Sequence, residues 1–322
     1  MTEWKDGIAK ITLPTPFAVG DVNVYLIRGE RLTLVDTGAK TEESWNSLIE
    51  QMAELDLSPK DIEQVVLTHH HPDHAGMLDF FPDSLEVYGH PLNERWIHPN
   101  EAFFQEQEHF FIEHFKEFGL PEEYFAILPK LRKTMKYMCN RPLTGHLFEG
   151  MRPLGLHDWK VLETPGHAQS QIALFREKDG VLIGGDLILA HISPNPLLEP
   201  PAPGEKERPK PQLQHNDSMK KLLHYPIHCV YTGHGDEVYQ LAELIEKRLT
   251  RQHERAMTVK TWLEEEELTV FQICQRLFPS VYQRELMLTI SETVAQLDYL
   301  ASIGEIISRD GQPVVYQAKP RD

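Results

Sequence analysis

The chain has 322 residues, of which 41% are hydrophobic and 25% charged. These fractions are typical of globular proteins, and the length is sufficient for two domains, which excludes a disordered, fibrous or single small-core protein. No apolar run reaches the roughly 18 residues that a membrane span requires, and the N-terminus lacks a basic segment followed by an apolar one. We therefore expect a cytoplasmic protein with no membrane partner.

The charge of the chain is strongly acidic, with 49 Asp and Glu against 32 Lys and Arg and a net charge of −17. Such a charge repels phosphate backbones and disfavours nonspecific binding of nucleic acid. The three cysteines, Cys139, Cys229 and Cys274, show no CxxC spacing. The sequence therefore predicts neither a disulfide framework nor a thiolate zinc site, which fits a reducing compartment.

The first 90 residues alternate strand-like and helix-like segments. Apolar, β-branched runs separated by glycine and proline predict strands at 8–13, 22–27 and 32–35, which we expect to form an antiparallel sheet. Apolar residues at a spacing of three and four predict a helix over 41–55. A strand at 64–67 then ends at Thr68.

The segment from about 91 to 145 is rich in aromatic residues and has a helical pattern, which predicts an inserted helical lid. Packing of these aromatics in a core is favoured over direct contact with a substrate. Strands are predicted again at 160–163, 171–175, 181–184 and 228–231, and the proline-rich stretch 193–211 is predicted to be a loop. We assign residues 1–240 to one domain.

Three helical segments and a hairpin are predicted after about residue 237. The helices end near residues 266, 277 and 303, and the pair Asp310–Gly311 is typical of a tight turn between two strands. This order of elements predicts a winged-helix-like domain over 241–322.

A histidine-rich motif follows the strand that ends at Thr68. His69, His71, Asp73 and His74 lie within six residues, on a loop where the backbone is free to bring them together. Imidazole and carboxylate ligands suit zinc, manganese or iron(II), and the lack of thiolates argues against a purely structural zinc site.

Three further candidates lie in glycine-marked turns after predicted strands. They are His167 in PGH, Asp186 in GGD and His234 in GHG. Glycine allows the backbone to approach a site closely, and strand ends present ligands to a common cleft. The sequence therefore predicts a metal site, in preference to a surface histidine patch.

Five motifs in this order resemble the metallo-β-lactamase superfamily: VDTG at 35–38, THHHPDH at 68–74, PGH at 165–167, GD at 185–186 and GHG at 233–235. The resemblance covers residues 7 to 240. It implies an α+β fold, a four-layer αβ/βα sandwich with the metals at one edge, to which we add the helical insertion and the winged-helix-like domain.

The same resemblance implies a set of ligands. One metal is held by His69, His71 and His167, and the other by Asp73, His74 and His234, while Asp186 bridges both. Asp36 lies behind the site and orients a ligand. His70 occupies the variable position of the motif.

Two divalent ions about 3.5–4 Å apart lower the pKa of a shared water to about 7, so that hydroxide is available as a nucleophile at neutral pH. Asp73 then accepts or relays the proton. We expect a binuclear hydrolase acting on a small thioester, lactone or related ester, with zinc as the first choice of metal and manganese or iron(II) as alternatives. His191 and Ser193, just after Asp186, are candidate pocket residues, although a role in the turn alone explains them equally well.

The alternative function is a metal-dependent ribonuclease or phosphodiesterase whose C-terminal domain contacts nucleic acid. A row of basic residues at helical spacing favours it: Lys247, Arg248, Arg251, Arg255 and Lys260. The C-terminal region is nevertheless acidic overall, and such a row is more often a solvated helix face. The apolar side of the third helix suits packing on the first domain or a homodimer contact.

Overall fold

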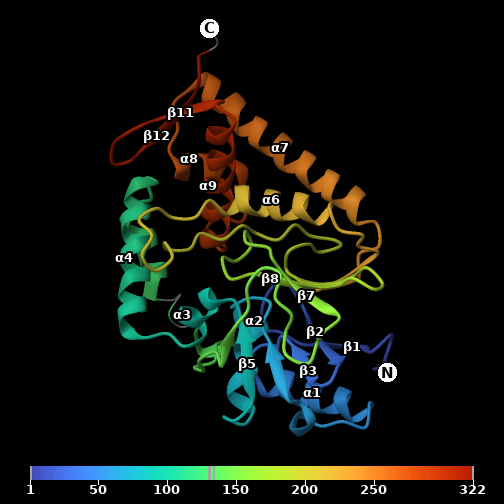
Figure 1. Cartoon of the computed structure of the whole chain (residues 1–322). Helices are drawn as coiled ribbons and strands as arrows, with labels where there is room; N and C mark the ends of the chain where they lie inside the picture. Colours follow the sequence, from blue (N-terminus) through green and yellow to red (C-terminus); the bar gives the residue numbers. More distant parts are fainter. Residues whose placement is uncertain (1, 130–131, 133–134, 321–322) are drawn as a thin grey trace.

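A computed structural model describes residues 2–129, 132 and 135–320 of the chain. Two β-sheets pack face to face, and helices cover their outer surfaces (Figure 1). Residues 130–131 and 133–134 of the predicted insertion lie outside the described residues.

The first sheet has six strands in the order β1-β2-β3-β4-β5-β6. The strands are β1 (Ile8–Leu13), β2 (Val22–Arg28), β3 (Leu32–Val35), β4 (Gln64–Val66), β5 (Glu86–Gly89) and β6 (Gly145–His146). The first three pair antiparallel, as predicted, whereas β3 to β6, for which no pairing was predicted, pair parallel. The reason is that β3 and β4 are joined by a crossover that contains α1 (Glu42–Ala53), and such a crossover brings the chain back in the same direction.

The second sheet has the order β10-β9-β8-β7. Its strands are β7 (Trp159–Glu163), β8 (Ile172–Arg176), β9 (Val181–Gly185) and β10 (Cys229–Thr232). Both faces of this sheet are buried, because Ile172 and Leu174 of β8 join the core between the sheets while Ala173 and Phe175 join a second core on the other side. This alternation is the period of two that a strand imposes.

Helices form the two outer layers. Leu48 and Met52 of α1 are buried against the first sheet. Met219 and Leu222 of α6 (Pro211–Leu222) are buried against the second sheet. The proline-rich stretch before Pro211 is irregular, as predicted. The layers are therefore helix, sheet, sheet and helix, the predicted sandwich.

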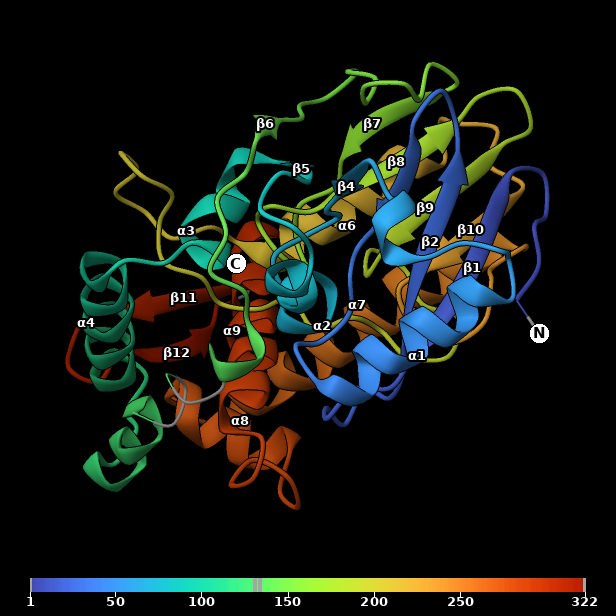
Figure 2. The same cartoon turned by 90° about the horizontal axis from the view of Figure 1, so that it is seen from below.

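The insertion contains α3 (Glu94–Ile97), α4 (Glu101–Glu117) and 3-10 turns at Pro91–Asn93, Glu122–Ile127 and Met135–Tyr137. Phe110, Phe111 and Phe115 of α4 pack in one core with residues of the C-terminal helices. Two backbone hydrogen bonds join the same parts: Phe271 N–H donates to the carbonyl of Phe118, and Val314 N–H to that of Glu117. Figures 1 and 2 both show α4 beside the C-terminal hairpin.

The C-terminal region consists of α7 (Leu241–Glu265), α8 (Val270–Leu277), α9 (Leu286–Ser302) and a hairpin of β11 (Ile306–Arg309) and β12 (Val315–Ala318). The predicted three helices and hairpin are thus present. Their identity as a winged-helix-like domain, and the domain boundary at residue 240, stay predictions. Among the described residues, no helix is both long and apolar enough to span a membrane.

Candidate metal centre

The predicted ligands come from the ends of four strands, at one edge of the two sheets. His69 and His71 follow β4, and the short helix α2 (Pro72–Ala75) carries Asp73 and His74. His167, Asp186 and His234 follow β7, β9 and β10 in the other sheet. All seven predicted ligands converge, in three overlapping groups whose candidate ligand atoms lie within 4.8 Å of one another: His69, His71 and His167; His69, His74 and Asp186; and Asp73, His74 and His234.

The Nδ1 atoms of three of these histidines are held by oxygen acceptors outside the group. His74 Nδ1 contacts Asp36 Oδ2 at 2.8 Å, His167 Nδ1 contacts the carbonyl of Asn195 at 2.9 Å, and His234 Nδ1 contacts the carbonyl of Asp21 at 2.7 Å. Carboxylate and carbonyl oxygens only accept, so each Nδ1 carries the hydrogen. The Nε2 atom of each ring is therefore left to face the centre, which is the usual arrangement of metal-binding histidines.

Within the described part of the chain, four buried atoms at the centre have no hydrogen-bond partner: Nε2 of His74, His167 and His234, and Oδ1 of Asp186. They nevertheless lie close together. His234 Nε2 is 3.3 Å from Asp73 Oδ2, His74 Nε2 is 3.4 Å from Asp186 Oδ1, and His167 Nε2 is 3.5 Å from Asp186 Oδ2.

These separations fit a shared cation. Ligands at about 2.1 Å from a tetrahedral zinc ion are roughly 3.4 Å from one another. Buried polar atoms that lack partners are otherwise costly and rare. The donor set and its spacing are therefore those of a divalent metal site.

Asp36 fixes the histidine loop from behind. Its Oδ1 accepts a hydrogen bond from the backbone N–H of Thr68, and its Oδ2 accepts from the Thr68 hydroxyl, both at 2.7 Å. The Thr68 hydroxyl in turn lies 3.0 Å from Nδ1 of His69. Asp36 has a positive φ of 59°, which is uncommon for a residue other than glycine and occurs often at functional sites. The structure thus places Asp36 in contact with His74 and, through Thr68, with His69.

Two glycines leave room for the centre. A Cβ on Gly233 would collide with Oδ1 of Asp186 and would lie 2.9 Å from Cε1 of His74. A Cβ on Gly185 would lie 2.7 Å from the Thr68 hydroxyl, and Gly185 has a positive φ of 50°. The GD and GHG motifs therefore contain glycine because a side chain would fill the space around the ligands.

The buried carboxylates are balanced by histidines. Burial acts to lower the pKa of His234, but Asp186 and Asp73 raise it to about 10. Burial would raise the pKa of Asp186, but His74 and His234 hold it well below its ordinary value. By contrast, burial and the neighbouring His167 lower the pKa of His71 to about 3. The centre thus keeps its carboxylates ionised and has a neutral imidazole at His71, the state that binds a metal.

The other candidates lie away from the centre. Nδ1 of His70 is 2.8 Å from the Ser170 hydroxyl, and its ring stacks on Trp96 with the centroids 4.4 Å apart. His191 and Ser193 are exposed and line a neighbouring cavity; His191 Nε2 lies 2.9 Å from Oδ2 of Asp236. Neither is among the seven residues that converge.

Sequence reasoning missed two kinds of residue. Thr68 belongs to the THHHPDH motif, which is a sequence signal for it, but its contacts with Asp36 and His69 are seen only in the structure. Asn195 and Asp21 act through backbone carbonyls, for which the side chain gives no signal.

Comparisons with known proteins agree with this geometry. The model of the metallo-beta-lactamase superfamily matches residues 18–234. The probable metallo-hydrolase YqjP of Bacillus subtilis (strain 168) is 45% identical over 317 residues, which cover 98% of this chain and 99% of that protein.

Two solved structures share nearly the whole fold. The metallo-beta-lactamase family protein TTHA1429 from Thermus thermophilus has a TM-score of 0.80 and 27% identity, covering 98% of this chain and 99% of that one. A beta-lactamase domain protein from Burkholderia ambifaria has a TM-score of 0.77 and 22% identity over 99% of this chain and 93% of that one, a likeness of fold alone. This chain therefore belongs to the metallo-β-lactamase superfamily and is a metal-dependent hydrolase.

Proposed function

We propose that the chain is a binuclear hydrolase, and that it cleaves a thioester, a lactone or a related ester in a small molecule. The observation that carries this proposal is that the buried Nε2 atoms of His74, His167 and His234 have no hydrogen-bond partner among the described residues, although each lies 3.3–3.5 Å from a carboxylate oxygen. Two metal cations bound between these residues would give each of these atoms a partner.

The grouping of the ligand atoms suggests how two cations are shared. His69, His71 and His167 would hold one cation, and Asp73, His74 and His234 the other. Asp186 would serve both, since its Oδ1 faces His74 and its Oδ2 faces His167 and His234. Nitrogen and carboxylate ligands without thiolate suit zinc first, and manganese or iron(II) could use the same set.

Such cations supply water activation at neutral pH and polarise the oxygen of the bond to be cleaved. The residues of the chain do the positioning. Asp36, Asn195 and Asp21 orient the rings of the histidines that contact them. Asp73 is suited to accept or relay the proton that hydrolysis releases, since its carboxylate is kept ionised: burial acts to raise its pKa, but His74 and His234 lower it below its ordinary value.

A small ester is favoured over RNA because the predicted basic row does not form one surface. The Lys260 ammonium is buried and paired with Glu305, and Lys247 lines a separate groove with Tyr239 and Glu243. We propose that the C-terminal region, with the element order of a winged helix, serves the hydrolase centre by walling a cavity beside it and does not bind nucleic acid. The nuclease function remains the competing hypothesis.

Metal analysis of the purified chain tests the binuclear centre. We expect about two divalent ions per chain, and fewer in His69→Ala and Asp186→Ala. His70→Ala is the matched control, because His70 is the next residue in the motif but its ring stacks on Trp96. Full metal content and activity in His69→Ala and Asp186→Ala would refute the proposed centre.

Substrate class requires a separate assay. Thioesters, lactones and phosphodiesters are offered to the enzyme loaded with zinc, manganese or iron(II). We expect hydrolysis of an ester or thioester. Cleavage of RNA, with binding that weakens steeply as salt rises, would support the nuclease instead.

A further inference from the structure

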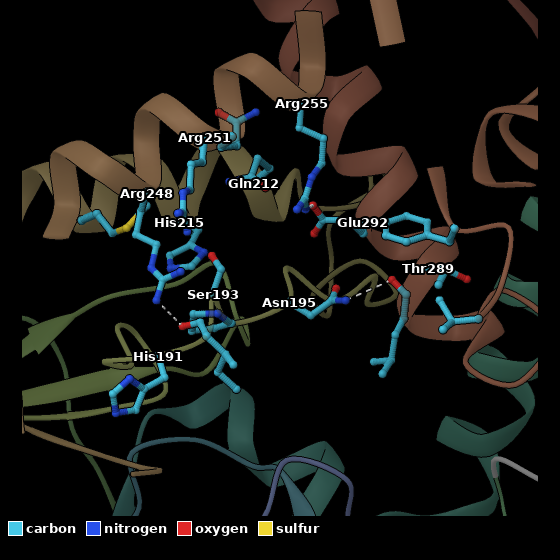
Figure 3. Close-up of a pocket in the computed structure, with 17 residues that line it drawn as sticks. His191, Ser193, Asn195, Gln212, His215, Arg248, Arg251, Arg255, Thr289 and Glu292 are labelled. Carbon is cyan, nitrogen blue, oxygen red and sulfur yellow. Dashed lines mark hydrogen bonds and ion pairs between the residues drawn. The ribbon is translucent and has the colours of Figure 1, made fainter. Parts of the chain in front are cut away.

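A cavity of about 390 Å³ lies between α6, α7, α9 and the loop that follows β9 (Figure 3). Three arginines of α7 line it: Arg248, Arg251 and Arg255. Their spacing of three and four residues places them on one face of the helix. A chain with a net charge of −17 thus concentrates three cations around one small space.

The charge of these arginines is only partly neutralised. Arg248 Nη2 donates to the carbonyls of Leu189 and Ile192, at 3.0 and 2.8 Å, and these acceptors carry no formal charge. Arg255 pairs with Glu292 of α9. Within the described residues, no carboxylate lies within 4.0 Å of the Arg248 or Arg251 guanidinium. Figure 3 shows the Arg255 side chain directed toward Glu292.

The other side chains that line the cavity add no further carboxylate. Among the described residues that line it, Glu292 is the one acidic residue, so three positive charges face a single negative one. His215, also in the wall, is uncharged at neutral pH, because burial lowers its pKa to about 4, and its Nε2 lies 2.8 Å from the carbonyl of Leu187. The Ser193 hydroxyl is a further polar group of the lining, and the side-chain amides of Gln212 and Gln252 each keep a second N–H besides the one that bonds to Asn216 or Gln296.

Asn195 joins this cavity to the metal centre. Its side chain lines the cavity and donates to the carbonyl of Leu288 at 3.1 Å, while its own carbonyl accepts the hydrogen bond from Nδ1 of His167 at 2.9 Å. The same loop leads back to Asp186, nine residues earlier in the chain. Asn195 therefore contacts both the cavity and one ligand of the proposed metal centre.

We propose that this cavity binds a carboxylate or phosphate group carried by the substrate, and that Arg251 and Arg255 hold this anion while the ester lies toward the metal centre. The proposal rests on the proposed hydrolase function and adds that the substrate is an anion. Arg251 supplies the free guanidinium, and Arg255 supplies a second one that Glu292 restrains. Arginine is suited to this role because its planar fork of N–H donors matches both groups.

The phosphate backbone of a nucleic acid fits this surface less well than a small anion does. The neighbouring lysines of the basic row do not line this cavity, and its volume of about 390 Å³ is in the range of small-molecule pockets. The occupant is therefore a terminal anion of a small molecule.

Calorimetric titration of the purified full-length chain with inorganic phosphate and with succinate tests the site. We expect binding that weakens with added salt, and at least about tenfold weaker binding in Arg251→Gln, because a hydrogen bond to a charged group is lost. Lys247→Gln is the matched control: it removes the same charge from the same helix but lines another groove, and it should bind like the unmodified chain. Tighter binding of phosphate would indicate a phosphate group on the substrate, and tighter binding of succinate a carboxylate group.

Glu292→Gln gives a prediction of the opposite sign. It removes the one carboxylate of the cavity with little change of shape, so anion binding should become several-fold tighter. Damage to the fold alone would not produce a gain. Equal affinities in Arg251→Gln and Lys247→Gln, no gain in Glu292→Gln, or no binding at all would overturn the proposal.

The titrations are repeated on Asp186→Ala, which lacks a proposed metal ligand. Anion binding that persists there and still depends on Arg251 supports the cavity even if the binuclear centre is wrong. Anion binding that is lost in Asp186→Ala but unchanged in Arg251→Gln would place the anion on the metals and would overturn the cavity site alone.

Discussion

Asp36 Oδ2 accepts a hydrogen bond from Nδ1 of His74 at 2.8 Å, and both side chains are buried. The same carboxylate accepts two hydrogen bonds from Thr68. Because all three partners are donors, the residue at position 36 must offer two acceptor oxygens. One carboxylate therefore sets the orientation of His74 directly and fixes the start of the histidine loop.

Asp36→Asn should weaken metal binding while preserving the fold. The side-chain NH2 group of asparagine would face a donor, either of Thr68 or of His74, so His74 would lose its fixed orientation. Loss of such a partner costs about 10- to 100-fold in metal affinity. Competition with a chelator measures this change. Asp158→Asn, at an exposed carboxylate paired with Lys178, should have no effect, and an unchanged affinity in Asp36→Asn would contradict the orienting role.

Gly233→Ala should empty the centre by displacing its ligands. The added methyl group would collide with Asp186 and approach His74, and both of these side chains are buried. We expect loss of most of the metal with the folded structure retained by circular dichroism. Gly204→Ala is the control for backbone strain, because that glycine has a positive φ of 91°, which Gly233 does not, but has open space around it. Full metal content in Gly233→Ala would show that the centre is more adaptable than this geometry allows.

Much of the fold and site was predictable because the chemistry lies in the side chains. The ligand motifs follow strands whose apolar runs are plain in the sequence, and strand ends converge at a sheet edge. His191 and Ser193 are predicted pocket residues because they follow Asp186 closely, and both line the cavity that contains Arg248, Arg251 and Arg255, the arginine cavity.

The arginine cavity shows what the sequence could not give. Arg248, Arg251 and Arg255 were visible as a basic row, but a row on one helix looks the same whether it faces water or a cavity. The difference depends on α9 and on the loop after β9, which are distant in sequence. The contact between α4 and the C-terminal helices was hidden for the same reason, since periodicity reports that a helix face is apolar but not which partner covers it.

Glu199 should make the stability of the chain depend on pH. Its carboxyl group is buried, with Oε1 accepting a hydrogen bond from the N–H of Gln169 at 2.9 Å, and burial raises its pKa from 4.5 to about 7. The folded chain thus binds this proton more tightly than the unfolded chain. Its contribution to the free energy of unfolding falls between pH 4.5 and about 7, and then stays constant.

Glu199→Gln removes the loss of stability that comes from ionising the buried Glu199 carboxyl group, and it keeps an oxygen acceptor for the N–H of Gln169. We expect the variant to be more stable than the unmodified chain by about 2–3 kcal/mol at pH 8, with little difference at pH 4.5, as measured by denaturant unfolding. Glu205→Gln is the control, because Glu205 is exposed and lines the same cavity as Glu199. It should leave the free energy of unfolding unchanged at both pH values. A stabilisation that does not vary with pH would contradict the assignment to the Glu199 proton.

Phe115→Ala should destabilise the C-terminal region as well as α4. Phe115 is 1% exposed and belongs to the core that contains Val270 and Ile290 of the C-terminal helices. Removing a buried phenyl group leaves a cavity and costs about 3–5 kcal/mol. If α4 and the C-terminal helices unfold as one unit, hydrogen exchange should rise in α8 and α9 as well as in α4. Phe148→Ala, at a side chain that is 45% exposed, should cost far less. Faster exchange confined to α4 would show that the insertion and the C-terminal helices are energetically separate despite their shared core.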